Sequence, residues 1–548
     1  MSKSILIVRN FVVNFILLLI FSAERCCAYW KGVSTSSASV LNLDTLGSYV
    51  SFGIDVSITT ASADEKILLL VNANVAAPDS TTSNTNNKLT FFRGTTDLAG
   101  GITKDLQFID VMGSSEMQSA TMAFLDSPAS VGTFSYSTNL HGKSIVSRYG
   151  QVRQMIALLL PSTIPSYTTV GNTNIIITTD TYSTGGIDTA VTTSSSTDLV
   201  LMFASVNMNS KSPTNAQYTI FRGNLQLDSY AMQTVSDVNT GRNKVATFCY
   251  LDSPGAAGSY MYSVRGRKRQ ASDGNFDFVQ SGRDLSVFSA LVLPSNMVNS
   301  FTSTQAVAVT SALWTLIGLS VSITPPLGND KVLVSVNVNF NPVSEGCQGV
   351  FTIFRDYVNL GDADYGLQVI RSSADRESYV ATMFFLDTPV ISRSAVTYTV
   401  MAKAVGGTFE VSYGGLTKQI TVVCTTALTA APTRAPTESP THLPSAAPTL
   451  VPTVAPSTNP TTSPSVNPTL NPSCAPSLTP TTEPTRTPTT EPTRTPTTER
   501  TRTPTTEPTR TPTTEPTRTP TADPTVIPTV LPTADPTVMP TADPTVMP

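Results

Sequence analysis

Three kinds of polar residue recur at matching places in three similar stretches of the chain, and they are the first candidates for chemistry. An arginine ends one apolar segment, an aspartate ends another 30 to 33 residues later, and a tyrosine follows 10 or 11 residues after that. The nine residues are Arg93, Asp126 and Tyr136, then Arg222, Asp252 and Tyr262, then Arg355, Asp387 and Tyr398. Each aspartate precedes Ser or Thr and then Pro, so we expect its carboxylate to cap a turn and to pair with the arginine. A ligand site is the alternative, and the tyrosines are expected to be core or cross-strand aromatics.

Histidine is nearly absent from the chain. The 548 residues include only His141 and His442. Nucleophilic triads, zinc sites and most general acid–base pairs depend on histidine. The sequence also has no G-x-S-x-G elbow, no phosphate-binding glycine loop and no C-x-x-C. We therefore expect no catalytic residues, no bound metal and no cofactor, which predicts a non-enzymatic protein.

The cysteines are too few for a disulfide framework in a protein of this size. Cys249 lies in the apolar segment VATFCYLD and is expected to be a small buried residue. Cys347 and Cys424 fall in the same repeat, and a disulfide between them is left open. Cys474 lies in the proline-rich tail, where it is either a free thiol or an intermolecular cross-link.

The same short motifs return three times in the same order. KLTFFRG at residues 88–94 returns as YTIFRGN at 218–224 and as FTIFRDY at 351–357. Downstream, ATMAFLDSP, ATFCYLDSP and ATMFFLDTP recur in step. The arginines of the first motif lie 129 and 133 residues apart. Repetition at a nearly constant period indicates three tandem domains.

The predicted organisation has five parts. They are a signal peptide (1–28), copy 1 (29–163), copy 2 (164–298), copy 3 (299–425) and a tail (426–548). Within each copy short segments place apolar residues at alternate positions, as Val332, Val334, Val336 and Val338 do, and clusters of turn-forming residues separate them. This pattern predicts an all-β chain of three tandem β-sandwich or jelly-roll-like domains.

The tail has a period of four residues. From Pro432 to Pro548 every fourth residue is proline, with Arg500 as the one exception. Proline fixes φ and lacks an N–H group, so 29 prolines at this spacing predict a disordered, polyproline-II-like chain. No asparagine lies in an N-x-Ser/Thr sequon, so glycosylation is expected to be O-linked on tail residues. The candidate threonines are Thr485, Thr489, Thr493 and Thr497.

The N-terminus predicts secretion. Lys3 and Arg9 precede an apolar run, and small residues follow near Ala28, which is the pattern of a cleaved signal peptide. Cleavage there would remove Cys26 and Cys27, and an uncleaved signal anchor is the alternative. No later segment has the ~18 apolar residues that a membrane span needs. We therefore expect no retained transmembrane segment.

Charge is sparse and nearly balanced. The 34 basic and 38 acidic residues give a net charge of −4, which disfavours nucleic acid as a partner. One basic segment, RGRKRQ at residues 265–270, is expected to be a charged hairpin tip, with a protease processing site as the alternative.

The combination of FTIFRD, FFLDTP and VTYTV with a signal peptide and a PTxxPT tail resembles structural glycoproteins of large DNA viruses that infect brown algae. The resemblance implies a coat or surface component of a virion that assembles with copies of itself and with other coat proteins. It also implies a place on the virion surface, reached through the secretory pathway.

Two other classes of protein have the same parts. A secreted adhesion protein of a cell surface or cell wall would bind polysaccharide through the sandwiches, and host-surface polysaccharide is a further candidate partner of a virion protein. A secreted glycan-active enzyme with a pair of carboxylates is the third class.

Overall fold

The structure is a computed structural model, and it describes most of the chain between residues 30 and 425. The described ranges are 30–44, 48–78, 85–100, 104–111, 116–238, 241–279, 285–325, 330–373, 377–389 and 394–425. The predicted signal peptide, the proline-rich tail, its candidate glycosylation sites and Cys474 all lie outside these residues.

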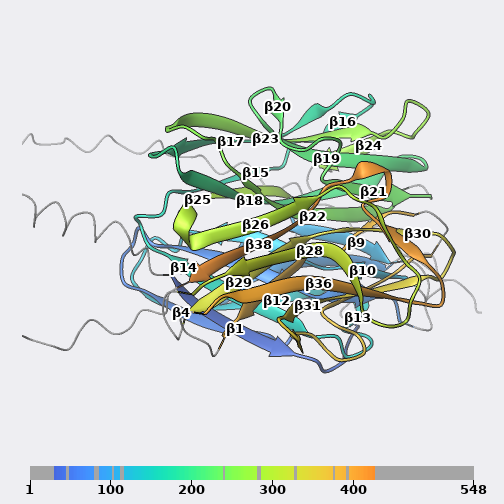
Figure 1. The fold of residues 1–548 in the computed structure, drawn as a ribbon, viewed down its shortest axis with the longest axis horizontal. Helices are drawn as coiled ribbons and strands as arrows, with labels where there is room; N and C mark the ends of the chain where they lie inside the picture. Colours follow the sequence, from blue (N-terminus) through green and yellow to red (C-terminus); the bar gives the residue numbers. More distant parts are fainter. Residues whose placement is uncertain are drawn as a thin grey trace, which may run out of the picture. The chain divides into compact units, whose positions relative to one another are not determined.

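Every extended element of the three copies is a β-strand (Figure 1). Copy 1 contains β1 (Lys31–Ser37), β2 (Leu41–Asp44), β3 (Val50–Ser51), β4 (Val56–Thr60), β5 (Lys66–Asn72), β6 (Asn74–Ala76), β7 (Thr85–Arg93), β8 (Thr96–Asp97), β9 (Gln107–Val111), β10 (Met117–Ser119), β11 (Met122–Asp126), β12 (Gly132–His141), β13 (Lys143–Val146) and β14 (Arg153–Leu160). Copy 2 contains β15 (Ser166–Gly171), β16 (Ile175–Ile177), β17 (Ser183–Thr193), β18 (Asp198–Ser210), β19 (Thr214–Arg222), β20 (Leu225–Gln226), β21 (Gln233–Asp237), β22 (Asn243–Asp252), β23 (Gly258–Lys268), β24 (Phe276–Val279) and β25 (Ser286–Pro294). Copy 3 contains β26 (Val298–Ser303), β27 (Val307–Val309), β28 (Thr315–Ile323), β29 (Lys331–Asn337), β30 (Asn339–Pro342), β31 (Gln348–Arg355), β32 (Val358–Asn359), β33 (Gln368–Arg371), β34 (Tyr379–Val380), β35 (Met383–Asp387), β36 (Val396–Val405), β37 (Phe409–Val411) and β38 (Lys418–Thr425). Two short 3₁₀ turns, η1 (Ser295–Met297) and η2 (Tyr413–Gly415), complete the described elements.

Each copy folds into two facing antiparallel sheets with the same strand order. In copy 1 the inner sheet has the order β1-β14-β5-β11, and the outer sheet places β4, β12, β7 and β9 side by side. The corresponding inner sheets are β15-β25-β18-β22 and β26-β38-β29-β35, and the outer sheets are β17-β23-β19-β21 and β28-β36-β31-β33. Counted along each copy, the eight main strands therefore pair as 1-8-3-6 and 2-7-4-5, which is a jelly roll. The structure confirms the predicted all-β fold.

The two sheets of a copy differ in burial, and the sequence reflects this difference. Outer strands such as β17 and β28 bury every second residue, so one face packs on the core and the other faces solvent. Inner strands such as β14 and β38 are buried along their whole length. Their near-continuous apolar runs, MIALLL and ITVVC, follow from burial on both faces.

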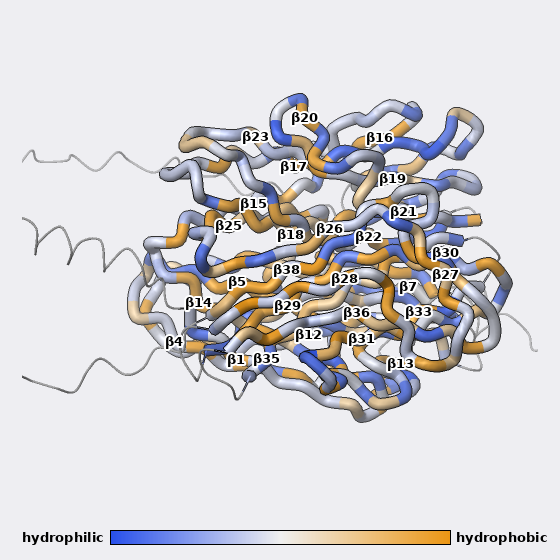
Figure 2. The backbone as a smooth tube through the Cα atoms, in the orientation of Figure 1, coloured by the Kyte–Doolittle hydropathy of each residue, from blue (hydrophilic) through white to orange (hydrophobic). Residues whose placement is uncertain are grey.

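The second face of each inner sheet is covered by the other copies. One apolar cluster contains Leu158 from copy 1, Leu201 from copy 2 and Leu333 from copy 3, together with the fully buried Trp30. Figure 2 shows apolar residues concentrated along central strands such as β5, β14 and β29. The three copies accordingly belong to one compact unit.

The strands change from one copy to the next close to the predicted boundaries. β14 ends at Leu160 and β15 begins at Ser166. β26 begins at Val298, the last residue assigned to copy 2 from the sequence. The basic segment 265–270 is not a hairpin tip, because its first four residues continue strand β23 to Lys268.

Candidate functional site

The structure joins each recurring arginine, aspartate and tyrosine into one triad. In copy 1, Arg93 in β7 and Tyr136 in β12 are cross-strand neighbours of the outer sheet. Asp126 ends β11 of the inner sheet. Its Oδ2 atom accepts hydrogen bonds from Arg93 Nη1 at 2.9 Å and from the Tyr136 hydroxyl at 2.7 Å. The triad therefore connects the two sheets of the sandwich.

Copies 2 and 3 repeat this geometry. In copy 2 the Asp252 carboxylate accepts from Arg222 at 2.8 Å and from Tyr262 at 2.6 Å. In copy 3, Arg355 and Tyr398 donate to the Asp387 carboxylate at 2.8 and 2.7 Å, respectively. The arginine and tyrosine are again cross-strand neighbours in both copies.

The triads hold sheets together and leave little capacity for a ligand. The side chain of Asp126 is only 8% exposed, and that of Arg93 is 27% exposed. Burial and the hydrogen bond to Asp126 raise the pKa of Tyr136, so its hydroxyl stays a donor. Among the described residues these carboxylates accept from the arginine and tyrosine side chains and from no backbone N–H group. The expected turn cap is therefore replaced by a bridge between sheets.

The disulfide considered for Cys347 and Cys424 is not present, because both are buried free thiols. Cys347 precedes the first residue of β31, whose last residue is Arg355. Cys424 lies near Tyr398, the cross-strand neighbour of Arg355. The two thiols are thus separated by the length of β31, about 26 Å, whereas a disulfide needs Cα atoms within about 7 Å. Cys249 is buried, as expected from its apolar segment.

A ring of three threonines lies where the copies meet. Thr121, Thr247 and Thr382 occupy the same position in the repeated motif AT-x-x-x-LD. The Thr247 hydroxyl donates to the carbonyl of Thr121 at 2.6 Å, and the Thr121 hydroxyl donates to the carbonyl of Thr382 at 3.0 Å. The Thr382 hydroxyl donates to the carbonyl of Thr247 and closes the ring. Three equivalent residues joined in a cycle define a pseudo-threefold axis.

Asparagines continue the same cycle around the axis. Asn207 of copy 2 accepts from the backbone N–H of Phe108 in copy 1 at 2.9 Å. Asn339 of copy 3 accepts from the N–H of Thr234 in copy 2 at 2.9 Å. Asn74 of copy 1 accepts from the N–H of Val369 in copy 3 at 3.1 Å.

These three contacts use equivalent positions and return to copy 1, so the copies form a closed head-to-tail ring. Three equivalent glutamines, next to the residues whose N–H groups bond to these asparagines, make contacts between the same pairs of copies. Gln107 donates to Ser205 at 3.1 Å, and Gln368 donates to Asn72 at 2.7 Å. Gln233 donates to Asn337 at the third junction.

A buried charge cluster completes the junction. Glu116, Arg242 and Glu377 lie five residues before the three ring threonines, and none of their side chains is exposed. Arg242 pairs with Glu116, and its Nη1 atom lies 3.5 Å from both Glu377 and Asp237. Lys244 pairs with Glu377.

The pKa values in this cluster follow from burial and charge. Burial alone would raise the pKa of Glu377, but Lys244 and Arg242 lower it overall, so the carboxylate stays ionised. Burial raises the pKa of the neighbouring Asp110 to about 6, even though Asn243 donates two hydrogen bonds to it. The junction thus contains three carboxylates that share two cations, together with one further carboxyl whose pKa burial raises.

The sequence contained a signal for this junction. The ring threonines lie inside a repeated motif. Asn74, Asn207 and Asn339 each follow the apolar run of β5, β18 or β29. The charge cluster had no such signal, because its equivalent positions carry Glu, Arg and Glu.

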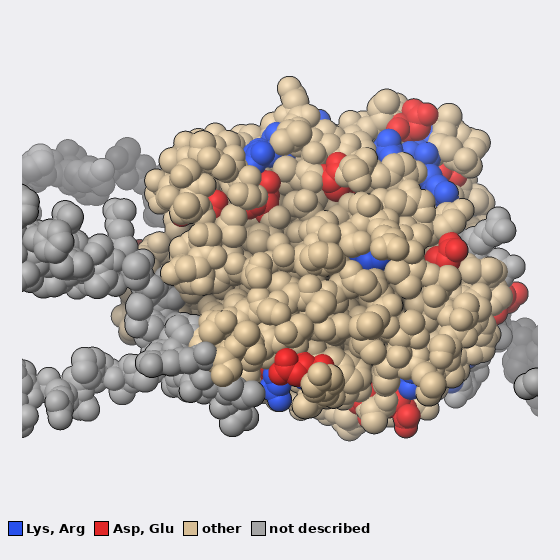
Figure 3. Space-filling view, viewed as in Figure 1, with Lys and Arg blue, Asp and Glu red and all other residues tan. Residues whose placement is uncertain are grey.

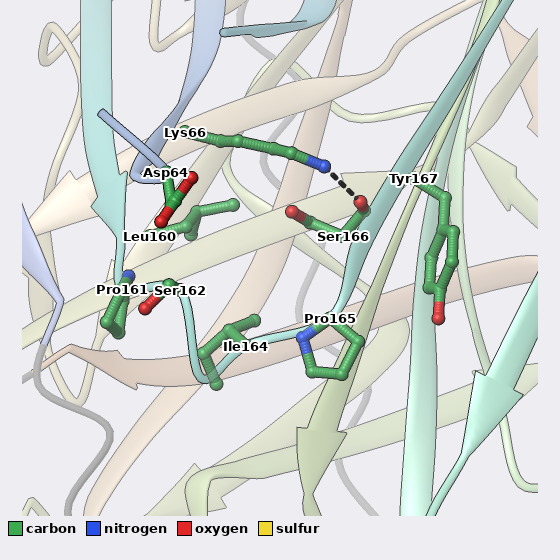
Figure 4. Close-up of a pocket in the computed structure, with 9 residues that line it drawn as sticks. All are labelled: Asp64, Lys66, Leu160, Pro161, Ser162, Ile164, Pro165, Ser166 and Tyr167. Atoms are coloured by element: carbon green, nitrogen blue, oxygen red, sulfur yellow. Dashed lines mark hydrogen bonds between the residues drawn. The ribbon is translucent and has the colours of Figure 1, made fainter. Parts of the chain in front are cut away.

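A pocket of about 200 Å³ opens at the connection between copies 1 and 2 (Figure 4). Lys66 Nζ donates to the carbonyl of Ser166 at 2.6 Å, and burial lowers the pKa of Lys66. Lys331 makes the equivalent contact from copy 3 to the carbonyl of Gly32 in copy 1, at 2.8 Å. Lys66 therefore serves the contact between copies, and the hydroxyls in this pocket have no histidine beside them.

The described residues include no group of three or more His, Cys, Asp or Glu side chains that could hold a metal ion. A search of the same residues for a helix long and apolar enough to span a membrane found none.

Comparisons with known proteins give only weak likenesses. No protein-family model matches the chain, and no curated protein sequence is similar to it. Among solved structures, PNGase F, a glycosylasparaginase from Flavobacterium meningosepticum, is 9% identical with a TM-score of 0.27, covering 48% of this chain and 96% of its own. The VP2 subviral particle of infectious bursal disease virus is 9% identical with a TM-score of 0.17, covering 72% and 81%. An archaeal-virus protein with a triple jelly-roll fold and a turret assembly is 12% identical with a TM-score of 0.15, covering 71% and 92%. All three TM-scores are below 0.5, so we draw no functional conclusion from these likenesses.

Proposed function

We propose that this chain is a non-enzymatic structural glycoprotein of a virion, a coat or surface component with an O-glycosylated Pro/Thr-rich stalk. The observation that carries the proposal is the closed ring of three jelly rolls. Its recurring polar residues are used to join sheets and copies: the triads bind sheet to sheet, and the threonines and asparagines bind copy to copy. A building block of this kind has its chemistry directed inward, as a structural subunit requires.

The surface supports the same proposal. Charged residues make up only 13% of the chain, and Figure 3 shows a face on which most of the described surface is neither acidic nor basic. A small net charge lowers the repulsion between neighbouring copies of a protein. Such a surface favours the side-by-side association of this protein with its own copies or with other coat proteins.

The tail would act as a stalk. Proline at every fourth position keeps a Thr-rich chain extended and open to glycosyltransferases. At about 3.1 Å per residue the 123 residues from 426 to 548 would span at most roughly 380 Å.

Mass spectrometry of purified virions tests the proposal. We expect peptides of all three copies in stoichiometric amounts and antibody labelling of intact particles. We also expect O-linked sugars on tail threonines such as Thr485 and Thr489, and unchanged gel mobility after enzymatic removal of N-glycans. Absence of the protein from purified particles would refute the coat function, whatever the state of the sugars.

An adhesion protein of a cell surface or cell wall is the second candidate. It is favoured by one observation, the stripe of arginine side chains at Arg265, Arg267 and Arg269. Recovery of the protein from wall fractions of virus-free cells would favour this function over the first.

A further inference from the structure

The outer sheet of each copy carries an aromatic pair next to a basic side chain at equivalent positions. The phenylalanine precedes the triad arginine, and the basic residue lies five positions after the triad tyrosine. The second aromatic directly precedes β3, β17 or β28, the strand that pairs with the one carrying the basic residue. The sets are Tyr49, Phe92 and His141 in copy 1, Tyr182, Phe221 and Arg267 in copy 2, and Trp314, Phe354 and Lys403 in copy 3.

The three sets share their geometry. The ring centroids of the aromatic pairs are 5.4, 5.5 and 6.1 Å apart in copies 1, 2 and 3. The Arg267 guanidinium lies 4.4 Å from the Tyr182 ring, and Lys403 Nζ lies 4.7 Å from the Trp314 ring. The His141 ring lies 5.6 Å from that of Tyr49.

The second aromatic of each set is anchored by its polar atom to the loop before the fifth main strand. Tyr182 donates to the carbonyl of Tyr230 at 2.5 Å, and Trp314 Nε1 donates to that of Ala363 at 3.3 Å. Tyr49 donates to the Asp105 carboxylate. These rings are therefore held in place before any partner arrives, which lowers the entropic cost of binding.

Copy 2 extends its set into a stripe of three arginines. Arg265, Arg267 and Arg269 alternate along β23 and beyond it, so they share one face at intervals of about 7 Å. Arg265 lies 4.1 Å from the Phe221 ring, and Arg269 lies 5.3 Å from the ring of Tyr413 in copy 3.

The three guanidinium groups keep their charge available. Within the described part of the chain none of them forms an ion pair with a carboxylate. Asp228, which acts electrostatically on Arg267, is half-buried and accepts a hydrogen bond from Gln226 at 2.6 Å. Figure 3 shows basic side chains, with acidic ones beside them, over the part of the surface that copy 2 forms.

The stripe is specific to copy 2 and is not a product of net charge. The positions equivalent to Arg265 are Asn139 in copy 1 and Met401 in copy 3. Residues 164–298 contain nine basic and nine acidic residues, so the charges of copy 2 balance as a whole. Three of these nine basic residues, Arg265, Arg267 and Arg269, follow one face of β23 and its continuation.

We propose that this arginine stripe binds an anionic polysaccharide, a linear glycan whose sugars carry carboxylate or sulfate groups. A guanidinium group supported on an aromatic face presents a planar fork that matches a two-oxygen anion, and regular spacing suits a partner whose charges repeat along a line. Nucleic acid fits less well, because guanidinium groups cover the faces of Phe221 and Tyr182 on which a base would stack. The binding is independent of the coat function, since a virion protein and a wall protein would each use it.

Biolayer interferometry with the full-length protein tests this binding. The immobilised probes are alginate, which carries carboxylates, dextran sulfate, which carries sulfates, and uncharged dextran. Poly-L-glutamate and a single-stranded oligonucleotide serve as anionic probes that are not polysaccharides. We expect binding to alginate, dextran sulfate or both, and the preference shows whether the stripe binds carboxylate or sulfate. Binding to uncharged dextran, poly-L-glutamate and the oligonucleotide should be at least tenfold weaker.

Variants connect the binding to the stripe. We expect R265S/R267S/R269S to weaken glycan binding at least tenfold and R265K/R267K/R269K to weaken it severalfold, because lysine keeps the charge without the fork. The matched control K31S/K104S/K143S removes the same charge from copy 1 and should change binding less than threefold. Equal weakening in the control, equal binding of the oligonucleotide or poly-L-glutamate, or no binding to either charged glycan would overturn the proposal. The lysine variant keeps the test valid if the serine variant fails to fold.

Discussion

Replacing Arg242 by methionine tests whether the buried charge cluster holds the three copies together. Methionine keeps much of the volume of the arginine stem but removes the cation. Glu116 then loses its ion pair with Arg242, but it keeps Lys244 Nζ at 3.9 Å and hydrogen bonds from Gln118 at 3.0 Å and Tyr379 at 2.9 Å. Glu377 keeps its pair with Lys244.

The expected cost follows from removing the nearest cation from the buried Glu116 carboxylate. Removing one partner of a buried ion pair costs about 3–5 kcal/mol. The hydrogen bonds that Glu116 retains place Arg242→Met near the lower end, at about 3 kcal/mol. In Glu116→Gln/Arg242→Met the buried carboxylate that lost its nearest cation is also gone, so the double variant should recover about 1–2 kcal/mol of that loss.

Equilibrium unfolding in guanidinium chloride measures these differences. Far-UV circular dichroism follows the sheets, and tryptophan fluorescence, to which the fully buried Trp30 contributes together with Trp314, follows the packing of the copies. Arg269→Met, at an exposed arginine, is the control and should cost less than about 1 kcal/mol. A cost for Arg242→Met no larger than that of Arg269→Met, or strict additivity of the two substitutions, would refute the role assigned to the cluster.

Three further outcomes follow from the structure. Tyr398→Phe removes the hydrogen bond to the Asp387 carboxylate and should cost about 1.5–3 kcal/mol of unfolding free energy, whereas Tyr357→Phe, at a side chain 96% exposed, should be neutral; equal effects would contradict the triad. Burial raises the pKa of Asp110 from 3.8 to about 6, so the folded state binds this proton more tightly than the unfolded state does. The stabilisation that comes from the protonated carboxyl is therefore lost as the pH rises from about 4 to about 6. Asp110→Asn should reduce the increase in unfolding free energy on going from pH 7 to pH 5, and an unchanged pH profile would contradict this. Burial raises the pKa of the Cys249 thiol to about 12, so a disulfide reagent at pH 8 should modify it only after unfolding, and modification of the native protein, mapped by mass spectrometry, would contradict its burial.

The fold was predictable because its signals are local and repeated. Alternating apolar and polar residues in β28 indicate a half-buried strand, and continuous apolar residues in β14 indicate a fully buried one. Both patterns can be recognised from the sequence of the strand alone. The recurrence of Arg93, Asp126 and Tyr136 in each copy marked them as structural. From the sequence each aspartate was expected to cap a turn and to pair with its arginine, but the sequence did not show that the tyrosine hydroxyl joins them or that the contact connects two facing sheets.

The points that the sequence left open or did not show have the same physical origin. Cys347 and Cys424 share a copy, but sharing a copy does not decide which end of a strand each residue occupies. Arg242 was hidden because isolated charged residues in a polar sequence are usually solvated. Only the packing of the copies shows that Glu116 and Glu377 converge on it.

The junction also explains why three copies belong in one chain. At the threonine ring the same residue serves in every copy, because a hydroxyl that donates to the next carbonyl closes a cycle of identical parts. The positions of Glu116, Arg242 and Glu377 follow a different rule. Three identical charges around a buried axis would repel one another, whereas Glu, Arg and Glu attract. A ring of identical subunits must place the same residue at all three positions. Linking the copies in one polypeptide removes that restriction, because each copy can then supply a different residue. The charge cluster therefore favours a ring with one of each copy over a ring in which the same copy occurs twice.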